Sequence, residues 1–280
     1  MFKRIILFLF IVTTIIAQDF TGIRIYINPG HGGHDSNDRY IAATGFWESE
    51  GNLGKGLHLR DILNSMNAIT KMSRTTNNTN DDLGLSVIAA DANNFDADYM
   101  HSIHSNAYNG QSNYTLILFQ GKDNAPTYPE AKVMGGYLAD EIFKAHRTST
   151  KYNRGDADFY GTGQPYLGVF KGLTMPGTLS EGSFHDYIPE SFRLKNDAYL
   201  DHEAWAITKA FIKYFNLEGL PYGEIAGVVR DAFNEVTYYA INSADKKKPA
   251  NLVKATLQPG NKLYLGDSFN NGFFLFDKVE

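Results

Sequence analysis

The chain has 280 residues, a formal net charge of −5 at pH 7 and no cysteine. A mildly acidic composition is not typical of nucleic-acid-binding proteins. The lack of cysteine excludes disulfides, thiol nucleophiles and thiolate metal ligands.

The first 17 residues have the layout of a secretory signal peptide. Lys3 and Arg4 precede an apolar run that ends at Ala17, which is the order of basic, apolar and small residues in such signals. A transmembrane anchor is the alternative, but the run is short for a span, which needs about 20 apolar residues. We expect cleavage near Ala17, export to the periplasm or cell surface, and no membrane span in the mature chain.

Strand-type and helix-type segments alternate over most of the chain. Strands are predicted at 23–28, 97–107, 114–121 and 173–184, and helices from about Glu48 to Met66 and at 83–95, 129–147 and 200–216. In the third helix, Val133, Tyr137, Ile142 and Phe143 are expected on the apolar side. This alternation predicts an α/β fold, with a mostly parallel central sheet and helices on both faces.

The sequence pattern changes at about Glu218, where short β-type segments separated by turn residues replace the helical pattern. The predicted division is a signal peptide at 1–17, a catalytic domain at 18–217 and a small β domain at 218–280.

Chemically active side chains follow three of the predicted strands. His31 follows the first, His104 follows the second, and Glu181 follows a third. Because the carboxyl ends of parallel strands face one crevice, these side chains can converge. Glu48 begins the first helix and can reach the same rim, and Glu50 competes with it.

Two imidazoles and one carboxylate form a common ligand set for catalytic zinc, which keeps its fourth position open for water. A further carboxylate is then needed to move the proton of that water, and Glu181 fits this role. Taken singly, each of these side chains also has a structural explanation, such as a solvated turn histidine or a helix-start carboxylate.

The order and spacing of five segments resemble the zinc-dependent N-acetylmuramoyl-L-alanine amidases of bacterial cell walls (the amidase_3 type). The resemblance covers about Ile23 to Asn216, and the segments are "NPGHGGHD", "ESEGNLGKGLHLRDIL", "SRTTNN", "ADANNFDADYMHSIHSNA" and "MPGTLSEGSF".

The resemblance implies a role for each candidate residue. It assigns one Zn²⁺ to His31, Glu48 and His104, which makes Glu50 the weaker choice, and it makes Glu181 the catalytic carboxylate. The implied reaction is hydrolysis of the amide between N-acetylmuramic acid and L-alanine, so peptidoglycan is the implied substrate. Nothing in the sequence identifies an activator protein.

The chain departs from the family pattern around these residues. Asn28 stands where the family usually has Asp, Ser180 replaces an apolar residue before the catalytic Glu, and Ser183 is an extra residue after it. These departures affect the surroundings of the site and not the four chemical residues.

The tail resembles the start of a carboxypeptidase-regulatory-like β-sandwich, with 223–234 as its opening strand and 268–280 as a late one. That family usually continues beyond this point, so we expect the natural chain to run on past Glu280 and this β unit to be incomplete.

Two other functions remain open at this stage. The chain could be a catalytically silent relative that only binds the wall, or a zinc carboxypeptidase that cuts another wall peptide bond. Metal content and turnover distinguish the first alternative, and the identity of the products distinguishes the second.

Overall fold

The computed structural model describes residues 20–34 and 39–280. The predicted signal peptide at 1–17 lies outside the described residues. Within them, no helix is both long and apolar enough to cross a membrane.

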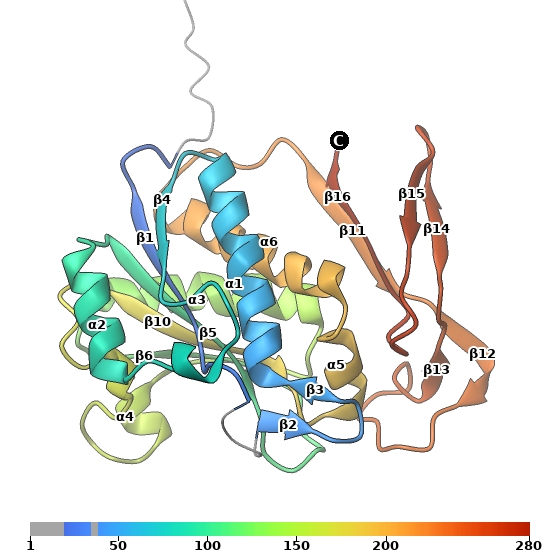
Figure 1. The fold of residues 1–280 in the computed structure, drawn as a ribbon, viewed down its shortest axis with the longest axis horizontal. Coiled ribbons are helices and arrows are strands. Elements are labelled where there is room, and N and C mark those ends of the chain that lie inside the picture. Colours follow the sequence, from blue (N-terminus) through green and yellow to red (C-terminus); the bar gives the residue numbers. More distant parts are fainter. Residues whose placement is uncertain (1–19, 35–38) are drawn as a thin grey trace, which may run out of the picture.

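The centre of the described structure is a six-stranded sheet (Figure 1). Its spatial order is β4 (Ile69–Met72), β1 (Arg24–Pro29), β5 (Tyr99–Asn106), β10 (Gly177–Phe184), β6 (Thr115–Phe119) and β9 (Lys151–Gly155). The first four strands are parallel, and β6 and β9 are parallel to each other but run opposite to β10. The predicted mostly parallel sheet is therefore confirmed, with two reversed strands at one side.

Helices cover both faces of the sheet, as predicted. One face packs against α1 (Glu48–Ser65), α3 (Pro129–His146) and α6 (Asp197–Tyr214). The other packs against α2 (Leu85–Asn94) and the 3-10 helix η3 (Gly168–Phe170). The remaining short elements are β2 (Tyr40–Ile41), β3 (Phe46–Trp47), η2 (Thr79–Asp81), β7 (Gly121–Lys122), β8 (Ala125–Pro126), α4 (Asp156–Phe159) and α5 (Ile188–Arg193).

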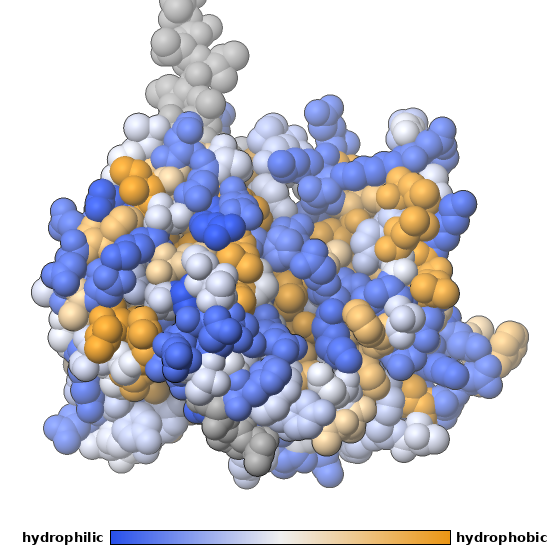
Figure 2. All heavy atoms as spheres, viewed as in Figure 1, coloured by the Kyte–Doolittle hydropathy of each residue, from blue (hydrophilic) through white to orange (hydrophobic). Residues whose placement is uncertain are grey.

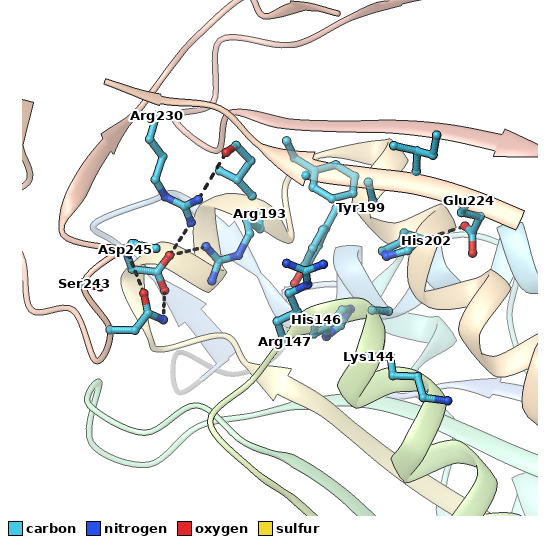
Figure 3. Close-up of a pocket in the computed structure, with 18 residues that line it drawn as sticks. Lys144, His146, Arg147, Arg193, Tyr199, His202, Glu224, Arg230, Ser243 and Asp245 are labelled. Atoms are coloured by element: carbon cyan, nitrogen blue, oxygen red, sulfur yellow. Dashed lines mark hydrogen bonds and ion pairs between the residues drawn. The ribbon is translucent and has the colours of Figure 1, made fainter. Parts of the chain in front are cut away.

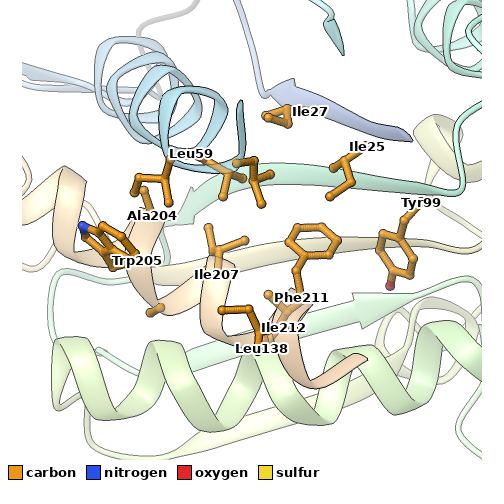
Figure 4. Close-up of a cluster of buried hydrophobic side chains, with 14 of the residues drawn as sticks. Ile25, Ile27, Leu59, Tyr99, Leu138, Ala204, Trp205, Ile207, Phe211 and Ile212 are labelled. Atoms are coloured by element: carbon orange, nitrogen blue, oxygen red, sulfur yellow. The ribbon is translucent and has the colours of Figure 1, made fainter. Parts of the chain in front are cut away.

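Successive side chains of β1 point alternately into the two hydrophobic cores, one on each face of the sheet. Ile25 and Ile27 point to the α1–α3–α6 side, and Tyr26 points to the α2 side. Phe211 of α6 is fully buried among these helices, at the centre of the cluster drawn in Figure 4.

The apolar stripe of α3 differs from the predicted one. Val133 is exposed, whereas Met134 and Leu138 are fully buried together with Ile142. These buried positions follow the i, i+4 spacing of one helix face, which lies one residue away from the predicted start.

The tail forms small antiparallel sheets, in line with its β-type sequence. The pairs are β11 (Gly223–Val228) with β16 (Phe273–Val279), β12 (Arg230–Glu235) with β13 (Lys247–Pro249), and β14 (Lys254–Leu257) with β15 (Lys262–Leu265). β16 packs on α6, where Phe273 contacts the Tyr199 ring edge to face. Apolar side chains gather over β14 and β15 in Figure 2, and Leu263 and Leu265 are exposed there.

A buried ion pair joins α1 to α6. Lys55 Nζ lies 2.7 Å from Glu203 Oε2, and both side chains are fully buried. His146 Nε2, at the end of α3, lies 3.1 Å from the same oxygen. Burial raises the pKa of Glu203, but Lys55 and His146 outweigh that effect and lower it to about 2.

Replacement of Lys55 by Met should destabilise the fold by about 3–5 kcal/mol, because it leaves the Glu203 carboxylate buried without its main partner. The double variant Lys55→Met/Glu203→Leu should recover most of this loss, since it removes both buried charges. Urea denaturation at pH 7, followed by circular dichroism, measures both values. Because the folded pKa of Glu203 lies below the ordinary value of 4.5, the stability from the pair is present above about pH 4.5 and is lost as the pH falls toward 2.

The matched control is Lys151→Met, which removes a partly exposed lysine that pairs with Asp140. An exposed pair contributes at most about 1 kcal/mol. Equal losses in the two single variants would contradict the structural role given to Lys55.

Candidate metal centre and its surroundings

The three predicted strand-end residues meet at one edge of the sheet. β1, β5 and β10 are neighbours, and all run in the same direction. His31 follows the end of β1, and Glu181 of β10 pairs in register with His104 of β5. Glu48, the first residue of α1, lies against the same edge.

His31, Glu48 and His104 form one compact cluster. Glu48 Oε2 lies 3.3 Å from His31 Nε2, and Glu48 Oε1 lies 3.3 Å from His104 Nδ1. The two imidazole rings meet edge to face, 4.7 Å between centroids. One ligand atom from each side chain lies within 4.8 Å of the other two, a spacing that can hold a metal ion.

Glu50, the competing carboxylate, points elsewhere. It is exposed, and its Oε1 lies 2.9 Å from Nε2 of His34. The His34 ring in turn stacks on Trp47. Of the two carboxylates at the start of α1, Glu48 is therefore the one that faces both histidines.

Two hydrogen bonds fix the Glu48 carboxylate. Asn52, one turn later in α1, donates its Nδ2 to Glu48 Oε1 at 3.0 Å, and the backbone N–H of Ser105 donates to the same oxygen at 3.1 Å. Asn52 also donates to the Gly30 carbonyl oxygen at 3.3 Å, which ties the helix to the turn after β1.

Arg74 holds the backbone of that turn by hydrogen bonds. Its buried guanidinium donates to the carbonyl oxygens of Pro29, Gly30 and Ser49 at 2.7–3.1 Å. The sequence pattern gave this arginine no role, although its position just after β4 places it at the same sheet edge. It holds the backbone on both sides of the cluster, before His31 and after Glu48.

Gly30 allows the closest approach at the site. A Cβ atom on Gly30 would lie 2.1–2.6 Å from three atoms of the His104 ring, closer than non-bonded atoms can come. The turn therefore needs glycine at position 30, because any side chain there would overlap the His104 ring.

Glu181 is partly buried beside this cluster. Burial raises the pKa of its carboxyl well above the usual range, repulsion from Glu48 raises it further, and Lys55 acts in the opposite direction. Its Oε2 has no hydrogen-bond partner in the described part of the chain. A carboxyl with a raised pKa and a free oxygen is suited to accepting and returning a proton.

The extra residue after Glu181 is accommodated by a β-bulge. Glu181 pairs with His104 and Phe184 with Asn106, so Gly182 and Ser183 face a single residue of β5. A Cβ on Gly182 would lie 2.4 Å from Oε1 of Glu203. The bulge therefore rests on the carboxylate that pairs with Lys55.

The polar side chains at the other two departures from the family pattern, Asn28 and Ser180, have hydrogen-bond partners. Asn28 donates to Ser102 Oγ at 2.7 Å and accepts from Ser73 Oγ at 2.8 Å. Ser180 Oγ lies 3.2 Å from His101 Nε2, on the face of β5 that points away from the cluster.

The charge states at the cluster suit a divalent metal. Burial raises the pKa of Glu48, but its contacts with His104 and His31 outweigh that effect and hold the pKa well below the usual range. Burial lowers the pKa of His104, although Glu48 partly opposes this. An ionised carboxylate beside a neutral imidazole is the form in which both side chains bind zinc.

Several known proteins are similar to this chain in sequence and in fold. The model of the N-acetylmuramoyl-L-alanine amidase family, Amidase_3, matches residues 25–213. The amidase CwlM of Bacillus licheniformis is 29% identical over 199 residues and is aligned over 70% of each chain. The germination-specific N-acetylmuramoyl-L-alanine amidase of Bacillus subtilis is 26% identical over 216 residues, which cover 72% of this chain and 83% of the relative.

Solved structures of amidases superpose on the same region. The catalytic domain of CwlV from Bacillus (Paenibacillus) polymyxa gives a TM-score of 0.59 at 21% identity, over 70% of this chain and 99% of that one. Cwp6 from Clostridium difficile gives a TM-score of 0.59 at 25% identity, over 69% of this chain and 29% of that one. The family match contains the central sheet except Arg24, the first residue of β1, and all four strand-end and helix-start residues described above. The protein therefore belongs to the N-acetylmuramoyl-L-alanine amidase family, whose members hydrolyse an amide bond of peptidoglycan.

Proposed function

We propose that the protein hydrolyses the amide between N-acetylmuramic acid and L-alanine of peptidoglycan, with one zinc ion bound by His31, Glu48 and His104 and with Glu181 as the catalytic carboxylate. The observation that carries this proposal is the convergence of the three ligand side chains beside a carboxyl group whose shielded Oε2 has no partner among the described residues, inside the region that matches the family.

The donor set fits zinc. Two imidazoles and one carboxylate leave a tetrahedral position open, and the ligand atoms are close enough to share one ion. When bound, zinc lowers the pKa of a water molecule and polarises the substrate carbonyl.

The protein's own side chains supply the remaining steps. Glu181 accepts a proton from the attacking water and delivers it to the amide nitrogen as the C–N bond breaks, so the products are a carboxylic acid and a free amine. Asn52 and the Ser105 N–H keep Glu48 oriented toward both histidines. The buried Arg74 holds the backbone on either side of them.

We further propose that residues 1–17 direct export, that residues 18–217 form the catalytic unit and that residues 218–280 form a separate β unit. Support comes from the order of basic, apolar and small residues at the start of the chain, the wall substrate of the family, and the end of the family match at residue 213. Sequencing of the secreted protein's N-terminus tests the cleavage at Ala17.

Purified sacculi digested with the mature protein should release stem peptides with a free L-alanine N-terminus. Release should stop with a chelator and return with added zinc, because the attacking water depends on the metal. Mass spectrometry of the soluble products measures this. Peptides cut at another bond would contradict the proposed substrate bond, and wall binding with bound zinc but no products would indicate a silent relative.

The variants His104→Ala and Glu181→Gln should separate metal binding from proton transfer. His104→Ala should lose zinc and activity together, because it removes one of three ligands. Glu181→Gln should keep zinc and lower kcat by about 10²–10⁴-fold, since an amide cannot accept the proton. Zinc content by atomic emission and initial rates on sacculi provide the two readouts.

A matched pair tests the choice of carboxylate. Glu48→Gln should lower the zinc content, and the exposed Glu50→Gln should leave it unchanged. The reverse result would assign the ligand to Glu50, and full activity in Glu181→Gln would exclude its catalytic role.

Gly30→Ala should weaken zinc binding by at least about tenfold, because the new methyl group displaces the His104 ring. Gly219→Ala is the control, since nothing lies within 4 Å of a Cβ there. Competition with a zinc-sensitive dye measures both affinities, and equal affinities would contradict the close packing of Gly30 on His104.

A further inference from the structure

A second cavity lies between the helices of the amidase unit and the tail (Figure 3). Its volume is about 620 Å³, which is within the range of sites that hold small ligands. The ends of α3 and α6, together with α5, form one wall, and β11 with the segment 242–245 forms the other. None of the four proposed zinc-site residues lines it.

The walls of this cavity carry an excess of positive charge. Four Lys or Arg residues line it against two carboxylates, and the six are Lys144, Arg147, Arg193, Arg230, Glu224 and Asp245. Both carboxylates already have partners: Asp245 accepts from Arg193 and Arg230, and Glu224 pairs with His202 and Lys209. Two of the cations also have acidic partners outside the lining, since Lys144 pairs with Glu141 and Arg193 with Glu190. Among the described residues, Arg147 is therefore the lining cation without an acidic counterion.

Two arginines on the walls are placed to meet a ligand. Arg147, at the left-handed end of α3, is exposed and has no side-chain partner among the described residues. Figure 3 shows it between the Arg193–Asp245 pair and the His202–Glu224 pair. The Arg230 side chain is 21% exposed, and its Nε has no acceptor in the described chain.

A free strand edge runs along the same cavity. Five consecutive residues of β11, 224–228, line it. Because successive side chains of a strand alternate between its faces, a continuous run of lining residues indicates that the cavity follows the edge of the strand. Within the described chain β11 pairs with β16 alone, so its other edge keeps unpaired N–H and C=O groups.

We propose that this cavity binds a short acidic peptide in extended form. The peptide backbone pairs with the free edge of β11, and its carboxylate lies against Arg147 and Arg230. Ile225, Val228 and Phe273 give the side chains an apolar surface. This combination favours a peptide, because a simple inorganic anion would use the charges but neither the strand edge nor the apolar wall.

The stem peptides released by the proposed amidase reaction belong to this class, since each ends in a free carboxylate. The binding site itself does not depend on that reaction. It can therefore be tested with zinc removed, so that a failure here is distinguishable from a failure of the proposed catalysis.

The test is calorimetric titration of the full mature chain, in the presence of a chelator, with alanyl-glutamyl-alanine and with the neutral alanyl-glutaminyl-alanine amide. The acidic peptide should bind at least tenfold more tightly. Arg147→Gln should weaken its binding at least tenfold, and Lys151→Gln, outside the cavity, should leave binding unchanged. In ¹⁵N NMR spectra, the shifts caused by the acidic peptide should centre on residues 224–228.

Three results would overturn the proposal. Equal affinity for the charged and neutral peptides would remove the role of the positive walls. Unchanged binding in Arg147→Gln, or shifts that leave 224–228 unaffected, would place the peptide elsewhere. Displacement of the peptide by inorganic phosphate at equal concentration would indicate a simple anion site without use of the strand edge.

Discussion

The site depends on the alignment of three neighbouring parallel strands that end at the same edge of the sheet. His31, His104 and Glu181 are separated by about 70 to 80 residues in sequence, yet the register of β1, β5 and β10 brings them together. Rigid strand ends hold side chains more precisely than loops do. The close contact of Gly30 with the His104 ring depends on the same alignment, since Gly30 N–H bonds to the carbonyl oxygen of Ile103.

Polar groups directly beneath these strand ends are buried but paired with one another. Lys55 contacts Ser105 Oγ, next to His104, and its partner Glu203 packs on Gly182, next to Glu181. One ion pair therefore supports both the proposed ligands and the proposed catalytic carboxyl. The pair lies directly behind the bulge in which β10 carries its extra residue, and Glu181 stays in register with His104 there.

Much of the fold could be predicted from the sequence, because strand and helix periods and turn residues are local signals. The elements near Glu48 and around 97–107 were predicted close to their observed places. Strand direction is not local, so the reversal of β6 was not predicted. The short strands β4 and β9 were not predicted as strands. Lys55 and Arg74 were missed for a related reason: their roles come from Glu203 and from backbone carbonyl oxygens, which only the folded chain brings to them.

The tail is held to the amidase unit by charges and not by apolar packing alone. Arg193 of α5 bonds to both Glu190 and Asp245, and Asp245 also accepts from Arg230 of β12. A buried charge chain of this kind is strongly destabilised by the loss of one member, so it fixes the two parts in one arrangement. The helix beside it, α6, supplies Glu203 beneath the proposed zinc site. The wall of the second cavity and the support of the proposed active site therefore share one rigid element.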